Sequence, residues 1–289
     1  MTVWKSWLLA ARPKTLPAAV VPVWAGCLVA YSLSGTLSLR LAVITVLGAL
    51  FIQIATNFFN DVIDAEKGTD TPGRLGPQRA AATGLLSSRA LYQGAGFMLV
   101  QALVCGIFLF QAQGWPIVLI GVPSLYLSFG YTGGPFPLAY LGLGELFVIL
   151  FFGLIAVAGT VFIQTGTWPP EAWLTGLQIG LLSAVLIAVN NYRDQEEDRA
   201  AGKRTLVVRW GRKPVARLIY VMTLTPALLV PLAGGGTCEF LAALGLAAVF
   251  LTCEFVLMRP DDVSPKLLGL SALHLVLFVA AQNACLALT

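Results

Sequence analysis

Long apolar runs separated by short polar segments dominate the chain. Each run is long enough to cross a bilayer as a helix of about 20 residues. The runs are continuous rather than alternating, which favours helices over membrane strands. The pattern predicts an all-α polytopic membrane protein of nine transmembrane helices in one domain, 1–289, with spans at 16–33, 41–59, 91–110, 115–132, 141–163, 172–192, 215–233, 240–258 and 267–288.

Composition agrees with this interpretation. The chain is 57% hydrophobic and 11% charged, whereas soluble proteins contain about 25% charged residues. The short segment 4–11 carries two tryptophans and a lysine and is typical of a helix lying on the membrane surface.

The basic residues indicate an orientation. If the amino terminus is cytoplasmic, nine spans place every lysine and arginine except Arg40 in cytoplasmic segments. Such a bias is expected of cytoplasmic loops. We therefore expect an integral protein of a prokaryotic cytoplasmic (inner) membrane. Its amino terminus and its two segments rich in charge, 57–79 and 190–212, would face the cytoplasm.

The two charged segments, 57–79 and 190–212, directly follow the second and sixth runs. Each contains four of the chain's 14 acidic residues. Carboxylates at the ends of membrane helices are costly and usually functional. The alternative is a pair of solvated loops whose charges set the topology.

Spacing within these segments favours a function. Asn57, Asp61 and Asp64 are separated by four and three residues, and the second segment repeats this with Asn190, Asp194 and Asp198 at intervals of four. Both sets would share one face of a helix. One amide and two carboxylates suit a hard cation such as Mg²⁺. Glu196 and Glu197 would point away from the second face.

Basic residues flank both acidic sets. Acids that hold metal ions and bases that hold the remaining anionic oxygens together predict a bound metal–phosphate complex. The loop alternative explains the bases but not the two helical faces. The bases concerned are Lys67, Arg74, Arg79, Arg193, Arg199, Lys203 and Arg204.

The two segments also suggest an internal repeat. Asn57 and Asp61 recur as Asn190 and Asp194, with four spans between equivalent positions. This spacing predicts two four-helix units plus a ninth helix around a central cavity, with one site at their junction.

The remaining reactive side chains suggest no further chemistry. The five cysteines are scattered, with no CxxC pair, and we expect packing roles without a disulfide or zinc site. The single histidine, His274, lies inside the last apolar run, which excludes a histidine-based triad or metal centre.

Several strings resemble the UbiA superfamily of intramembrane prenyltransferases, in particular its branch acting on 1,4-dihydroxy-2-naphthoate in menaquinone synthesis. The aspartate segments carry the superfamily resemblance, and the third and last strings narrow it to the branch. They are ARPKTLPAAVVPVWAG (11–26), NDVIDAEKGTD (60–70), YTGGPFPLAYLGLGELFV (131–148), RLGPQRAAATGLLS (74–87) and NNYRDQEEDRAAGKRTL (190–206).

The resemblance implies an enzyme with two aspartate motifs, 57–70 and 190–204, that bind a diphosphate through two or more Mg²⁺ ions. It implies Asp70 as a distal acid of the first motif and Asn191 as support in the second. Lys203, Arg204 and Tyr131 correspond to diphosphate-contacting positions. The positive charges of Arg79 and Lys67 make these two residues further candidates for binding the diphosphate. The implied substrates are a polyprenyl diphosphate and dihydroxynaphthoate, which loses its carboxyl group to give demethylmenaquinol.

The residues that would handle the aromatic acid stay open. Arg12 and Lys14 are candidates for binding its carboxylate, or they are ordinary membrane-anchoring bases. Glu145 would orient a ring hydroxyl or pair with a neighbouring base.

Other functions remain alternatives. These are a family member with 4-hydroxybenzoate, homogentisate or a glyceryl phosphate as acceptor, an ion-coupled transporter or channel, and a non-catalytic lipid-binding scaffold. A transporter would place acids in mid-span, away from phosphate-binding bases. We expect contact with the lipid bilayer, no nucleic acid and no obligate protein partner.

Overall fold

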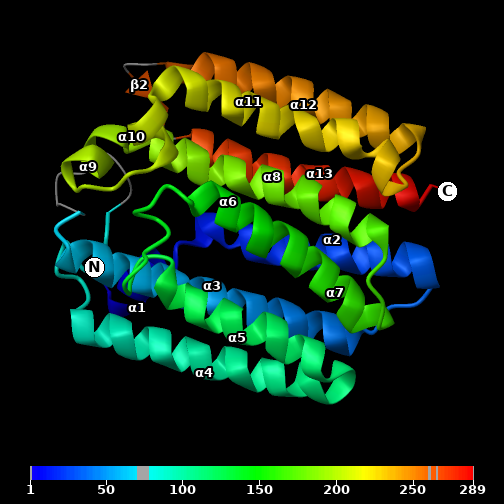
Figure 1. The fold of residues 1–289 in the computed structure, drawn as a ribbon, viewed down its shortest axis with the longest axis horizontal. Helices are drawn as coiled ribbons and strands as arrows, with labels where there is room; N and C mark the ends of the chain where they lie inside the picture. Colours follow the sequence, from blue (N-terminus) through cyan, green and yellow to red (C-terminus); the bar gives the residue numbers. More distant parts are fainter. Residues whose placement is uncertain (1, 70–77, 260–261, 265, 289) are drawn as a thin grey trace.

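The computed structural model describes residues 2–69, 78–259, 262–264 and 266–288, and it is a bundle of long helices lying side by side (Figure 1). The longer helices are α1 (Val3–Ala11), α2 (Pro17–Ser34), α3 (Leu39–Glu66), α4 (Ser88–Gln113), α5 (Trp115–Gly130), α7 (Ala156–Thr165), α8 (Pro170–Arg193), α11 (Arg212–Leu229), α12 (Thr237–Leu257) and α13 (Leu267–Leu286). Shorter elements are η1 (Pro13–Thr15), α6 (Gly144–Val148), η2 (Ile149–Ile155), α9 (Gln195–Ala200), α10 (Leu206–Trp210), η3 (Pro231–Ala233) and the strand pair β1 (Met258–Arg259) and β2 (Asp262–Val263).

Within the described residues, seven helices are long and apolar enough to cross a membrane when 144–165 is counted as one, which confirms an α-helical integral membrane protein. Two predicted spans are less clear within the described residues. Helix α5 has only 16 residues, and α11 begins with Arg212 and Lys213. The count of nine spans and the division into two four-helix units therefore stay predictions.

The second span is longer than its apolar run. The run predicts an end at residue 59, but α3 continues to Glu66. Asn57 to Asp64 consequently lie on the last turns of a regular helix, where buried polar side chains can project into the bundle.

The fifth span, 144–165, is one continuous helix formed by α6, η2 and α7. Its middle is a π-helix, a wide turn that often accompanies functional sites. Gly153 in this turn packs against Gly176 and Gly180 of α8 so closely that a Cβ on Gly153 would lie 2.4 Å from the Cα of Gly180. The small residues of α8 therefore let these two helices meet, as expected for membrane helices.

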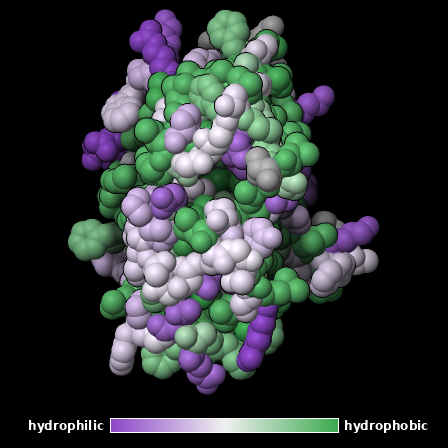
Figure 2. Space-filling model, turned by 90° about the vertical axis from the view of Figure 1, so that its right-hand side faces the viewer, coloured by the Kyte–Doolittle hydropathy of each residue, from purple (hydrophilic) through white to green (hydrophobic). Residues whose placement is uncertain are grey.

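Both ends of the bundle carry exposed tryptophans of the kind that mark membrane–water interfaces. We call the end with α1, α9 and α10 the site end, and the other the opposite end (Figure 1). Trp4 and Trp210 are exposed at the site end, and Trp115 and Trp173 at the opposite end. Figure 2 looks onto the opposite end, where hydrophilic residues are scattered around a partly hydrophobic surface.

Helix α1 takes the place predicted for a surface helix. Trp4 is 74% exposed, while Trp7 packs edge-on against Phe58 of α3 with 5.3 Å between ring centroids. The helix therefore presents one apolar side to the bundle and leaves the other available to lipid.

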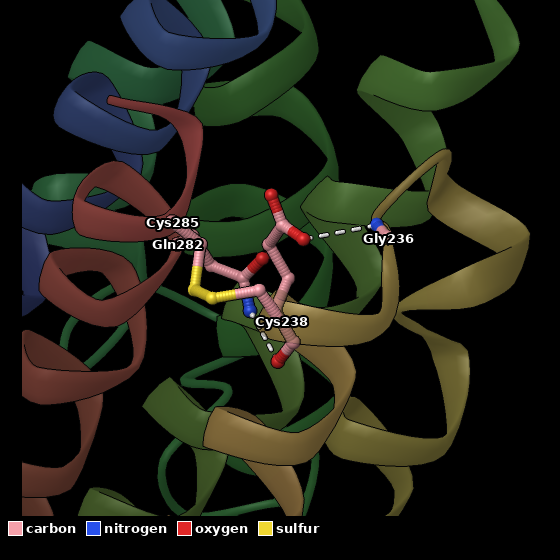
Figure 3. The surroundings of a disulfide bond; sticks show 5 residues. Gly236, Cys238, Gln282 and Cys285 are labelled. Atoms are coloured by element: carbon pink, nitrogen blue, oxygen red, sulfur yellow. Dashed lines mark hydrogen bonds between the residues drawn. A yellow bond between two sulfur atoms is a disulfide. The ribbon is translucent and has the colours of Figure 1, made fainter. Parts of the chain in front are cut away.

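A disulfide joins Cys238 at the start of α12 to Cys285 near the end of α13 (Figure 3). The prediction of packing roles for all five cysteines was therefore wrong for this pair. The two residues are 47 positions apart in sequence, and only the antiparallel arrangement of α12 and α13 brings their ends together. Cys27, Cys105 and Cys253 are free.

The disulfide makes a labelling experiment decisive. Denatured, unreduced protein should react with maleimide at its three free cysteines, and reduction should expose two more. The double variant Cys238→Ser/Cys285→Ser should melt at a lower temperature in detergent, because closing such a loop contributes about 2–4 kcal/mol. Cys253→Ser is the matched control. Labelling of all five cysteines without reductant would contradict the bond.

Candidate functional site

A polar cavity of about 440 Å³ opens at the site end of the bundle. Helices α3, α6 and α8, the segment before α2 and the loops after α5 and α9 supply its walls. The candidate site residues that line it are Arg12, Lys14, Asn57, Asp64, Arg79, Tyr131, Glu145, Asn190, Asn191, Asp194, Asp198 and Lys203.

The two aspartate motifs meet in this cavity through one lysine. The Lys203 Nζ lies 3.1 Å from Oδ2 of Asp64 and 3.9 Å from Oδ1 of Asp198. All three side chains are largely buried, so the attraction is weakly screened. Residues 139 positions apart therefore share one charged centre.

Tyr140, which the sequence did not single out, lies beside this centre. Its hydroxyl donates to Oδ1 of Asp64 at 2.7 Å. Its ring lies under the ammonium groups of Lys67 and Lys203, 4.0 and 5.0 Å from the centroid. Both distances are typical of cation–π contacts. The 131–143 loop thus positions the first motif and the base of the second.

Helix α3 presents a different polar stripe from the predicted one. The stripe that lines the cavity consists of Gln53, Asn57, Asn60 and Asp64, at intervals of four, three and four, with Thr56 beside it. Asp61 does not line it, because its two carboxylate oxygens accept the backbone N–H groups of Ala80 and Ala81, each at 3.1 Å. The expected sharing of one direction by Asn57, Asp61 and Asp64 was wrong, since Asn60 takes the position facing the cavity.

Asn60 is a hydrogen-bonding hub on this stripe. Its amide nitrogen donates to Oδ2 of Asp64 at 2.9 Å and to the Thr132 hydroxyl at 3.1 Å. Its carbonyl oxygen accepts from Nη2 of Arg12. Arg12 has a left-handed backbone with φ of 52°, a conformation that costs energy for a non-glycine residue and often accompanies functional sites.

The second motif spans a break in the helix. Helix α8 ends at Arg193 and α9 begins at Gln195, with Asp194 between them. Asn190, Asp194 and Asp198 all still line the cavity. Glu197 lines it too, so the expectation that Glu197 points away was wrong, because it assumed one uninterrupted helix.

Arg193 holds the first two polar side chains of the second motif, Asn190 and Asp194, in place. Its guanidinium donates to both carboxylate oxygens of Asp194, at 2.6 and 2.8 Å, and to the side-chain Oδ1 of Asn190 at 2.6 Å. Such a bidentate pair fixes both side chains. By contrast, Glu196 pairs with Arg199 on the exposed surface.

Several further residues from the sequence prediction are not part of the described cavity wall. Lys67 donates to the carbonyl oxygen of Thr132 at 2.9 Å. Arg204 contributes its backbone N–H, which donates to the carbonyl oxygen of Tyr140 at 3.0 Å. Asp70 and Arg74 lie outside the described residues.

Glu145 is held at the inner wall. Its Oε1 accepts from Nδ2 of Asn191 at 3.0 Å, and its side chain is buried at 4% exposure. Tyr131 stands close by, since a Cβ on Gly144 would lie 2.9 Å from its hydroxyl.

The charged groups around the cavity mouth change the pKa of Lys67. Burial lowers the pKa of Lys67, Asp64 opposes this change, and Lys203 adds to it. The cluster therefore concentrates positive charge above Tyr140 at a cost in desolvation, as expected of a site prepared for an anion.

A second cavity of about 470 Å³ continues from the first into the bundle. Its walls are almost entirely apolar and reach Leu109, Trp115 and Ile163 near the opposite end. Tyr131 and Phe152 line both cavities. A polar chamber therefore leads into an apolar channel that runs most of the length of the bundle.

The residues present fit Mg²⁺ bound together with a phosphate ligand. No three histidine, cysteine, aspartate or glutamate side chains in the described part of the chain could hold a metal ion by themselves. Mg²⁺ is commonly bound by one or two carboxylates plus substrate phosphates. Asp64 and Asp198, facing each other across Lys203, match that pattern.

Comparisons with known proteins agree with this geometry. A family model described as the UbiA prenyltransferase family matches residues 19–279. The chain is 31% identical to a 1,4-dihydroxy-2-naphthoate octaprenyltransferase of Haemophilus influenzae, over 94% of this chain and 93% of that one. It is 32% identical to a 2-carboxy-1,4-naphthoquinone phytyltransferase of Synechocystis, over 72% and 67%.

Solved structures match the fold. The structure of a UbiA homolog from Archaeoglobus fulgidus bound to GPP and Mg²⁺ aligns with a TM-score of 0.72 at 16% identity, covering 98% of this chain and 99% of that one. This likeness concerns the arrangement of the helices.

The Lys203 bridge can be tested without substrate. Lys203→Met should lower stability by about 3–5 kcal/mol, because two buried carboxylates lose their cation. Added Mg²⁺ should then raise the melting temperature of the variant more than that of the unmodified protein. Lys213→Met, an exposed charge loss on α11, is the control. An unchanged melting temperature and Mg²⁺ response would show that Lys203 does not bridge the motifs.

Proposed function

The chain belongs to the UbiA prenyltransferase family, and we propose that it transfers a polyprenyl group from its diphosphate to 1,4-dihydroxy-2-naphthoate, with loss of the carboxyl group. The observation that carries the proposal is the meeting of Asp64 and Asp198 around Lys203, at the mouth of an apolar channel. A charged diphosphate and a long apolar tail require these two environments side by side.

The diphosphate would lie between the two motifs. Asp64 and Asp198, supported by Asn57, Asn190 and Asp194, would hold the metal ions that accompany it. Bound Mg²⁺ supplies neutralisation of the leaving group. Lys203 and Arg79 add fixed positive charge where the departing diphosphate gains negative charge, which stabilises the transition state.

Asp61 has a supporting role in this proposal. By accepting the N–H groups of Ala80 and Ala81, it holds the segment that carries Arg79. Arg79 is 8% exposed and lines the cavity. Loss of the Asp61 carboxylate would therefore displace a base from the diphosphate.

The prenyl tail would follow the second cavity. Phe147 and Phe151 stack at 4.3 Å between centroids on its wall, and Phe152 lines the junction of the two cavities. Apolar walls exclude water, which would otherwise quench an allylic cation. The bound tail determines where this cation forms, close to Tyr131.

The acceptor would enter the polar cavity with its carboxylate toward Arg12 and Lys14. Both line the cavity, and Arg12 is already directed inward by its contact with Asn60. The contact with Asn60 favours a substrate-binding role for Arg12 over membrane anchoring alone. Lys14 is given the same role because it lies two residues away in the chain.

The protein would lie in the cytoplasmic membrane of a prokaryote with the site end in the cytoplasm. The bias of lysine and arginine toward the site end supports this orientation. The disulfide joins the start of α12 to the end of α13 at the opposite end (Figure 1), and disulfides persist in oxidising compartments outside the cytoplasm.

A prenyltransferase with another aromatic acceptor is the alternative. A transporter is disfavoured, because the acids of the polar cavity lie beside Arg79, Arg193 and Lys203 at one end of the bundle. Ion pathways instead place isolated ionisable groups along mid-span helices.

The transfer can be tested with purified protein in detergent. Mg²⁺, a polyprenyl diphosphate and dihydroxynaphthoate should give prenylated naphthoquinol, detected by mass spectrometry. Product from 4-hydroxybenzoate or homogentisate, but none from dihydroxynaphthoate, would contradict the acceptor assignment.

Aspartate variants can distinguish the proposed metal ligands from the residue that supports the Arg79 segment. Asp64→Asn and Asp198→Asn should lower turnover by about 10²–10³-fold, because they remove charge from the proposed metal ligands. Asp61→Asn should also lower turnover, and in addition lower the melting temperature, because Asp61 holds the Ala80–Ala81 turn. Near-normal turnover in the Asp64 or Asp198 variant would remove the metal role from that residue.

A further inference from the structure

Four buried side chains that line the polar cavity have oxygen atoms without hydrogen-bond partners among the described residues. They are Gln53, Glu145, Ser183 and Thr205, with exposures of 7%, 4%, 2% and 3%. A buried acceptor left unpaired costs free energy, and native proteins contain few of them. Several together in one cavity indicate a polar ligand.

The two strongest of these groups are fixed as acceptors. Nε2 of Gln53 donates to Oδ1 of Asn57 at 3.3 Å, which leaves Oε1 as the atom without a partner. Asn191 donates to Oε1 of Glu145 at 3.0 Å, which leaves Oε2. The neighbouring residues on α3 and α8 therefore hold both side chains so that each offers an oxygen acceptor to the cavity.

We propose that Gln53 Oε1 and Glu145 Oε2 each accept one hydroxyl of a dihydroxy aromatic acceptor, so that the cavity selects a hydroquinone over a monophenol. This inference rests on the proposed prenyl transfer and names the groups that recognise its acceptor. Two ring hydroxyls supply the two donors that the wall lacks. A site built around such hydrogen bonds discriminates strongly against a ligand that cannot make them.

Glu145 receives the hydroxyl beside the reacting carbon, because only its carboxylate can also take up a proton. The allylic C–O bond breaks, and the diphosphate leaves with its electron pair. The ring π electrons at the carbon bearing the acceptor's carboxylate then form the bond to the allylic carbon. The O–H electron pair becomes a carbonyl bond, and the proton passes to Glu145 Oε2. Loss of CO₂ then returns an electron pair to the ring oxygen, which recovers the proton from Glu145.

The second hydroxyl therefore belongs to Gln53, on the turn of α3 just inside Asn57. Gln53 lines both cavities, as do Tyr131 and Phe152. The ring would thus lie between its two hydrogen-bond acceptors and next to the entrance of the apolar channel. No oxidant or additional cofactor is needed, since the hydroquinone is recovered in the product.

The experiment compares 1,4-dihydroxy-2-naphthoate with 1-hydroxy-2-naphthoate, which lacks only the hydroxyl assigned to Gln53. Acceptor affinity is measured by calorimetry in EDTA, where no transfer occurs, and turnover is measured separately with Mg²⁺. The unmodified protein should bind the monohydroxy acid about ten- to a hundredfold more weakly. This comparison does not depend on the folding of any variant.

Gln53→Met should abolish this preference by weakening only the dihydroxy acid. Glu145→Gln keeps the contact with Asn191 but puts an N–H donor where the acceptor oxygen was, so it should weaken the binding of both acids to a similar extent. Because the proton acceptor is also lost, kcat should fall by about 10²–10⁴-fold in addition. Gln178→Met and Glu254→Gln are matched controls. Both residues are buried in membrane helices, hydrogen-bonded to Pro226 and Thr223 respectively, and neither lines the polar cavity.

Two kinds of result would overturn the inference. One is equal affinity of the unmodified protein for the two acids, or an unchanged preference between them in Gln53→Met. The other is normal kcat in Glu145→Gln. If the unmodified protein prefers the dihydroxy acid in EDTA but forms no product with Mg²⁺, the recognition stands and the proposed transfer fails.

Discussion

The structure depends on an electrostatic contact between parts of the chain that are far apart. A single ammonium group lies between carboxylates from α3 and α9, and the ring of Tyr140 lies beneath it. In a low-dielectric interior two facing carboxylates repel strongly unless a cation separates them. The fold therefore brings the motifs together only with a positive charge between them, which is also the arrangement that a metal–diphosphate ligand requires.

The rest of the bundle separates two environments around this contact. The polar residues that line the first cavity lie mainly on the last turns of α3, on α6, around the break between α8 and α9, and in the loops beside them. Deeper in the bundle the walls are apolar, and the π-helical turn at 149–155 carries the aromatic residues that line them. Gly153 lets this wide turn pack closely against α8. A substrate with a charged head and an apolar tail can occupy both environments at once.

The inner wall explains how a site for diphosphate also becomes selective for an aromatic partner. The oxygens of Asp61, Asp64 and Asp194 already have hydrogen-bond or ion-pair partners, whereas Gln53 and Glu145 each keep an oxygen without one. Polar groups whose hydrogen bonds are all made within the protein keep the site rigid. Polar groups that lack a partner in the protein can form hydrogen bonds with a ligand. The hydrogen bonds to Asn57 and Asn191 hold Gln53 and Glu145 in place, so their unpaired oxygens point in fixed directions.

The sequence by itself determined the membrane class, most of the helices and the residues of both aspartate motifs, because long apolar runs and clustered charges leave few alternatives. Tertiary structure decided which of these side chains face the cavity. Asp61 turns aside because Ala80 and Ala81 supply its hydrogen bonds, and Glu197 turns inward because the helix breaks at Asp194. Tyr140, Gln53 and the Cys238–Cys285 bond carried no local signal, since each depends on a partner from another part of the fold, and sequence spacing reports only neighbours along the same helix.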